Sequence, residues 1–252
     1  MSKPRATQLH AAPVLGLLLV VSAFAASAAR ADIIVIGSDA PAIKAGSVLA
    51  DSATLDVPSG ANVTVMLPSG RTERLKGPLK RVVAELARGE KADPGLWDSV
   101  QRYVQKQGKP SEAPVGAVRS LAPKPAKAPL PFSWRQVPVD ADGDVCVEKG
   151  APIEVARPAG GKSARLTVVD MQGQKRAETA FAEGAASAPW PKGIEAKVGT
   201  YSLVVEGAPM REFRLRLVAP LPDPDDTLRV LHGQRCQRQV EAWLRAIMTA
   251  AK

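Results

Sequence analysis

The sequence predicts a mainly β protein with some helix: a small N-terminal antiparallel sheet plus helices, a Pro-rich linker, and an immunoglobulin-like β-sandwich closed by a C-terminal helix. Two observations predict this class. Short β-branched segments alternate with Pro, Gly and Ser turns in residues 32–107 and again in residues 132–252. A hydrophobic content of 45% and a charged content of 23% are typical of a globular chain, and 252 residues suffice for two modest domains.

Residues 1–31 have the parts of a secretory signal peptide. Basic residues come first, an apolar stretch begins at Val14, and Ala29 and Ala31 form the small-x-small cleavage pattern that leaves Asp32 as the first mature residue. The alternative is an uncleaved membrane anchor, but the strongly apolar run is shorter than the ~20 residues that a spanning helix needs. The Ala-, Pro- and Arg-rich composition suggests a bacterium. We therefore expect export to the periplasm and no transmembrane segment after cleavage.

The first mature region, residues 32–107, is expected to form a small sheet followed by two helices. Asp93 and Pro94 are a typical N-cap and first-turn pair, and they open the second helix. Apolar residues at helical spacing predict the first helix over residues 79–86. The expected strands, each ending at a turn sequence, are 32–36, 53–57, 62–67 and 71–75.

Residues 108–131 are expected to be a linker, because six prolines lie there among Ala, Gly, Ser and Lys without apolar periodicity. Its basic residues offer contact with an acidic polymer or a lipid surface, but a solvated spacer is the simpler interpretation. The net charge of +9 does not indicate a nucleic-acid partner, since residues 1–31 and 108–138 together carry seven of these nine charges. Neither folded region is basic enough for a phosphate-binding surface.

Residues 132–252 are expected to form the sandwich domain. Tyr201 stands in a Gly-x-Tyr-x-Leu strand start that resembles the one common in immunoglobulin-like folds, where the tyrosine serves packing. The chain then ends in helical segments, with an apolar stripe from Val240 to Ile247. Seven strands are expected, over 144–148, 153–157, 164–169, 175–181, 188–190, 200–206 and 212–218.

The only two cysteines, Cys146 and Cys236, both follow the signal peptide. An even pair in an oxidising compartment predicts a disulfide, here between the first sandwich strand and the terminal helix. A redox-active pair would more often be close in sequence, so we expect a structural role.

Two motifs suggest chemistry, and both depart from their patterns. The acidic run from Asp140 to Asp144 begins like a calcium loop, but it lacks the glycine at position 6 and the glutamate at position 12. Residues 160–163 imitate the end of a phosphate-binding loop, but a strand is expected after them, so we interpret them as a hairpin turn. His232 is the only imidazole of the mature chain. No metal, cofactor or catalytic residue is therefore predicted, although paired carboxylates remain an open alternative.

One segment resembles a known family. Residues 43–49 contain a Gly-x-x-Leu pattern, Val57-Pro58-x-Gly60 marks a strand and turn, and Ser69-Gly70-Arg71 marks the next turn. Over about 45 residues this arrangement is similar to the FecR-type periplasmic domain. The sequence departs from the family in having Pro68-Ser69-Gly70 where an Asp-Gly turn is usual, and in the helices that follow. The resemblance implies an extracytoplasmic β module used in sensing or assembly, without catalysis.

These observations predict a non-catalytic periplasmic protein that acts in envelope sensing or assembly through protein–protein contacts. The expected partner is an envelope protein or a cell-wall component, and nucleic acid is excluded. The alternative is a cell-envelope enzyme that uses carboxylates in a cleft between the two modules.

Overall fold

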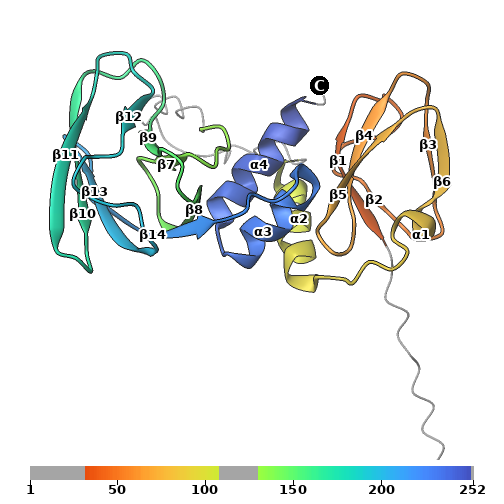
Figure 1. Cartoon of the computed structure of the whole chain (residues 1–252). Helices are drawn as coiled ribbons and strands as arrows, with labels where there is room; N and C mark the ends of the chain where they lie inside the picture. The colour runs from red at the N-terminus through yellow and green to blue at the C-terminus, as the bar shows by residue number, and fades with distance from the viewer. Residues whose placement is uncertain (1–31, 108–129, 251–252) are drawn as a thin grey trace, which may run out of the picture.

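The computed structural model describes residues 32–107 and 130–250 of the chain. The predicted signal segment with Ala29 and Ala31, and most of the predicted linker, lie outside the described residues. Figure 1 shows an N-terminal β region and a β-sandwich with helices α2, α3 and α4 between them. The structure thus confirms the mainly β class with a C-terminal helix packed on strands. Within the described ranges, no helix combines the length and the apolar character that crossing a bilayer requires.

The N-terminal β region contains a four-stranded antiparallel sheet and a two-stranded ribbon. The sheet has the strand order β2-β1-β4-β5, and the ribbon is the pair β3 and β6. The bounds are β1 (Ile33–Ser38), β2 (Val48–Leu49), β3 (Thr54–Val57), β4 (Asn62–Met66), β5 (Thr72–Lys76) and β6 (Leu79–Val82).

Strand β1 is buried on both faces, as its continuous run of Ile and Val residues requires. Ile33 and Val35 pack into the core of the β region, beside residues of β3 and β4. Ile34 and Ile36 face the other way and pack against the helices. One strand therefore contributes to two separate cores.

The helix predicted over residues 79–86 is wrong in its first half. Leu79–Val82 is strand β6, which pairs with β3 from Val57↔Leu79 to Thr54↔Val82, and only Val83–Leu86 forms a single helical turn, α1. Val82 is 38% exposed, so the apolar positions do not share one helical face. Pairing with β3 supplies the backbone hydrogen bonds of these four residues as a strand.

Helix α2 (Pro94–Gln107) begins where the sequence predicts. The Asp93 carboxylate accepts a hydrogen bond from the Leu96 N–H at 3.1 Å, which satisfies one of the free donors of the first turn. Leu96, Val100 and Val104 form its buried face.

The sandwich consists of a five-stranded sheet, β11-β10-β13-β14-β8, and a three-stranded sheet, β12-β9-β7. All seven predicted strands are present, and the three-residue β7, which contains a proline, is an addition. Two pairs are parallel, β8 with β14 and β7 with β9. The chain passes from one sheet to the other between β7 and β8 and returns between β8 and β9. The bounds are β7 (Gln136–Pro138), β8 (Gly143–Glu148), β9 (Glu154–Ala156), β10 (Ala164–Asp170), β11 (Lys175–Phe181), β12 (Ser187–Pro189), β13 (Gly199–Val205) and β14 (Arg211–Val218).

Tyr201 is fully buried in the sandwich and has the packing role that its Gly-x-Tyr-x-Leu context predicts. Its ring stacks on Phe213, and its hydroxyl lies 3.1 Å from the carbonyl oxygens of both Glu195 and Lys197. The hydroxyl also accepts a hydrogen bond from the Lys197 N–H. This connection of a strand start to the backbone upstream is the tyrosine corner of immunoglobulin-like sandwiches. Burial raises the pKa of this phenol.

The C-terminal helices join the two β regions. A 3₁₀ turn, η1 (Pro224–Asp226), leads into α3 (Thr227–Gly233), and α4 (Gln237–Ala250) follows. The sequence predicts that the terminal helix closes the sandwich, but α4 also packs against β1 of the N-terminal sheet. One buried cluster accordingly contains residues from every part of the molecule: Ile34, Ile36 and Met66 from the N-terminal sheet, Leu96 and Val100 from α2, Cys146 and Val218 from the sandwich, and Leu231, Val240 and Leu244 from α3 and α4.

Asp170 holds the hairpin between β10 and β11. Its buried carboxylate accepts hydrogen bonds from the N–H groups of Gly173 and Gln172, at 2.9 and 3.0 Å, and forms a 3.1 Å ion pair with Lys197. The Gly173 N–H, the Lys197 ammonium and the Gln172 N–H lower the pKa of Asp170 below its ordinary value.

Asp170→Asn is predicted to destabilise the protein at neutral pH but not in acid. A carboxyl with a lowered folded pKa adds stability above its unfolded pKa, and this stability is lost as the pH falls through the folded pKa. Urea unfolding at pH 7, 5 and 3 should show the difference from the wild type shrinking as the pH falls. The exposed Glu183→Gln is the matched control. An Asp170→Asn deficit that is unchanged at pH 3 would show that the carboxylate charge is not responsible.

Candidate functional site

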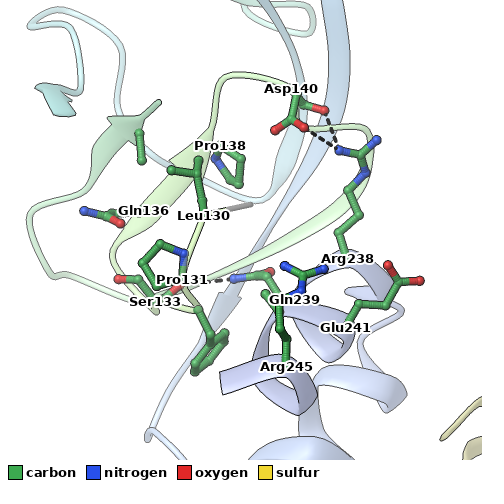
Figure 2. Close-up of a pocket in the computed structure, with 13 residues that line it drawn as sticks. Leu130, Pro131, Ser133, Gln136, Pro138, Asp140, Arg238, Gln239, Glu241 and Arg245 are labelled. Atoms are coloured by element: carbon green, nitrogen blue, oxygen red, sulfur yellow. Dashed lines mark hydrogen bonds and ion pairs between the residues drawn. The ribbon is translucent and has the colours of Figure 1, made fainter. Parts of the chain in front are cut away.

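A groove lies where the sandwich meets helix α4, and we call it the junction groove. It encloses about 270 Å³ and has a mixed polar and apolar lining. Figure 2 shows residues between Leu130 and Asp140, where the chain enters the sandwich, on one side and side chains of α4 on the other. The lining residues are Leu130, Pro131, Phe132, Ser133, Gln136, Pro138, Asp140, Ala156, Arg238, Gln239, Glu241, Ala242 and Arg245.

Gln239 connects α4 to the open edge of strand β8. Its side-chain oxygen accepts a hydrogen bond from the Cys146 N–H at 2.6 Å, and its amide nitrogen donates to the Cys146 carbonyl at 2.7 Å. The same nitrogen lies 3.2 Å from the Ser133 carbonyl. The amide thus replaces the strand that would otherwise pair with β8, and it satisfies two backbone groups that are buried from water.

The disulfide between Cys146 and Cys236 reinforces this connection, as predicted. The two Cα atoms are 5.9 Å apart, and both side chains are fully buried. Cys236 lies directly before α4, so the bond attaches the start of this helix to β8. A link across a sequence separation of 90 residues contributes about 4–5 kcal/mol in the chain-entropy account.

Arg238 binds two carboxylates of the acidic run that begins like a calcium loop. Its guanidinium contacts the Asp140 carboxylate at 3.1 Å and the Asp142 carboxylate at 2.5 Å. Asp144, the third acid, instead forms a 2.7 Å ion pair with Arg216 of the neighbouring strand. Each of the three carboxylates therefore forms an ion pair with an arginine, and no group of three metal-ligating side chains is found in residues 32–107 and 130–250.

Glu241 and Arg245 are the groove residues whose charges are available to a partner. They are one helical turn apart on α4, and both are half-buried. Neither side chain has a hydrogen bond or ion pair with another residue that the structure describes. The groove therefore offers one anionic and one cationic group above a partly apolar floor.

The remaining predicted site residues lie elsewhere. Asp32 is at the start of β1, where its carboxylate accepts a hydrogen bond from the Asp51 N–H at 3.3 Å. His232 is in the last turn of α3, near Gly95 of α2, and does not line the junction groove.

The sequence analysis did not identify Gln239 or Arg245. A signal for Gln239 was present: it lies three residues after Cys236 and four before Trp243, on the apolar stripe of the helix. An amide on a buried face must find partners, which marks it as a connection to another element. Arg245 has no such signal, because arginine on a helix surface is common.

No family model matches the chain, and no curated protein or solved structure matches it.

Gln239→Leu is predicted to lower the free energy of unfolding by about 2–4 kcal/mol, because it leaves two buried backbone groups of Cys146 without partners. Leucine has a similar volume, so the loss reports the hydrogen bonds and not a cavity. Gln237→Leu, on the exposed face of the same helix, should change stability by about 0.5 kcal/mol or less. Guanidinium unfolding of the oxidised variants measures both, and an equal effect of the two substitutions would contradict the assignment.

Proposed function

We propose that the protein is a non-catalytic interaction protein of the bacterial envelope, which acts in sensing or assembly by holding a protein partner in the junction groove. The observation that carries the proposal is the construction of this groove. Its walls are fixed by the Cys146–Cys236 disulfide and the Gln239 hydrogen bonds, while Glu241 and Arg245 remain available. A preformed groove avoids the ordering cost that a mobile surface has when it binds.

The form of the groove favours an extended polypeptide segment as occupant. Among the described strands, β7 pairs only with β9 and is therefore an edge strand, and its residues Gln136 and Pro138 line the groove. Extended segments commonly bind beside edge strands, where side-chain pockets give specificity. A segment that carries both charges would meet Arg245 and Glu241 on the opposite wall.

The carboxylates at the groove support contact over catalysis. The side chains of Asp140 and Asp142 are 62% and 53% exposed, and both are bound by Arg238. A carboxyl that acts as a general acid usually sits in an apolar site that raises its pKa. The enzyme alternative would therefore depend on Glu241, the other carboxylate in the lining.

Two observations support the envelope location. A buried disulfide is typical of proteins that fold in an oxidising compartment, and in bacteria this compartment is the periplasm. The N-terminal segment has the pattern of a cleaved signal peptide, and the strands β2 to β5 lie in the stretch that carries the FecR-like resemblance.

Site-specific photocrosslinking in cells tests this proposal. A benzophenone amino acid at position 136 or 241 should give an adduct of one size with an envelope protein, because both positions line the groove. The same group at position 175, on the distant end of β11, should give none. Adding Arg245→Glu should abolish the groove adducts, since it reverses one of the two available charges.

Adducts from position 175 as strong as those from the groove would contradict the assignment of the surface. Loss of turnover of a cell-wall substrate on Glu241→Gln, with the crosslinks retained, would instead establish the enzyme alternative. Stability of the variants should be checked by urea unfolding, so that a lost adduct is not a lost fold.

A further inference from the structure

A second groove lies at one end of the sandwich, and we call it the loop-end groove. It encloses about 510 Å³ between the connection from β9 to β10 and the hairpin from β13 to β14. The connection includes residues 160–163, for which the sequence suggests a hairpin turn. That interpretation is wrong, because β9 and β10 belong to different sheets and this turn joins them. The predicted strand after the turn is present as β10.

The notable residue of this groove is Arg157, which is 8% exposed. Its Nε donates to the Ala185 carbonyl at 2.9 Å, and its Nη2 donates to the carbonyls of Gly161 and Ala182 at 3.1 and 3.0 Å. The guanidinium also lies over the Phe181 ring, 4.4 Å from its centroid. These contacts fix the position of the cation but bring no negative charge to it.

Arg157 lacks two kinds of partner in the part of the chain that the structure describes. No carboxylate lies within ion-pair distance, and the two N–H groups of Nη1 have no acceptor. The arginine side chain is a cation with five N–H donors and no acceptor. Buried charges are normally paired, and an unpaired one points to an anion from outside the chain.

The opening toward Nη1 depends on Gly161. A Cβ at this position would lie 2.9 Å from the Arg157 Cζ and 3.0 Å from Nη1, which is too close for an ordinary contact. Glycine therefore leaves the guanidinium edge uncovered on this side. Two further cations, Lys162 and Arg211, line the same groove and are exposed at its rim.

We propose that the loop-end groove binds a carboxylate carried on a short apolar body, with the Arg157 guanidinium as its anchor. Val139, Pro158, Val205 and Pro209 supply apolar lining for that body, and the volume lies in the usual range for small ligands. Glu206 and Asp140 also line the groove, and their negative charge disfavours a doubly charged phosphate more than a singly charged carboxylate. The carboxylate belongs either to the C-terminus of a peptide or to a free short-chain acid.

Binding is measured on the full oxidised protein by ¹H–¹⁵N chemical-shift titration, with the Gly161 and Gly207 amides as reporters. The probes are acetyl-Ala-Val with a free C-terminus and octanoate, each beside its neutral amide, and inorganic phosphate. At least one acid should bind at least about tenfold more tightly than its amide, because a charged acceptor strengthens the hydrogen bonds. The tighter of the two acids identifies the source of the carboxylate.

Two variants and a control separate binding from folding. Arg157→Gln should abolish acid binding. Because it also removes structural hydrogen bonds, the paired rim variant Lys162→Gln/Arg211→Gln provides the independent test: its side chains are exposed, and it should weaken acid binding about tenfold with unchanged stability. Lys175→Gln, at the opposite end of the same sheet, should bind as the wild type does.

Three results would overturn the proposal. These are equal affinity for each acid and its amide, no weakening in the rim variant, and tighter binding of phosphate than of both acids.

Discussion

The attachment of Cys146 to helix α4 is the constraint on which the arrangement of the molecule depends. This residue of β8 is held twice, covalently by Cys236 and through its backbone by the Gln239 amide. The opposite side of the helical layer packs on Ile34 and Ile36 of β1, so the sandwich and the N-terminal sheet share one buried cluster. A substitution that loosens α4 therefore affects both β regions, because the helices α2, α3 and α4 lie between them (Figure 1).

This constraint also determines the shape of the junction groove. The junction groove is formed by the same elements that α4 holds together, so its shape is fixed before a partner arrives. The loop-end groove is supported differently, by the three carbonyl contacts and the ring contact that fix Arg157. The junction groove offers charged side chains on a fixed surface. In the loop-end groove, the buried Arg157 has no counter-charge among the residues that the structure describes. Both proposals therefore depend on the position and charge of a few side chains.

Local patterns in the sequence predict most of the fold, because they act over a few residues. The Asp93 cap, the buried run of β1, the seven sandwich strands and the Tyr201 corner all follow from such patterns. The spacing of apolar residues in 79–86 misleads, since pairing with β3 decides the structure there. Packing of α4 on β1 could not be predicted, because it joins segments about 200 residues apart. The sites depend on such distant contacts too. The disulfide could be predicted because Cys146 and Cys236 are the only two cysteines. The environment of Arg157 could not, because it depends on which residues of the described chain surround the guanidinium.

Calorimetry of residues 32–252 with the disulfide oxidised tests the central claim most directly. If α4 unites the two β regions through one shared core, heating at neutral pH should give a single transition whose calorimetric enthalpy equals its van't Hoff enthalpy. Two separate transitions, one for the N-terminal β region and one for the sandwich with its helices, would contradict the claim.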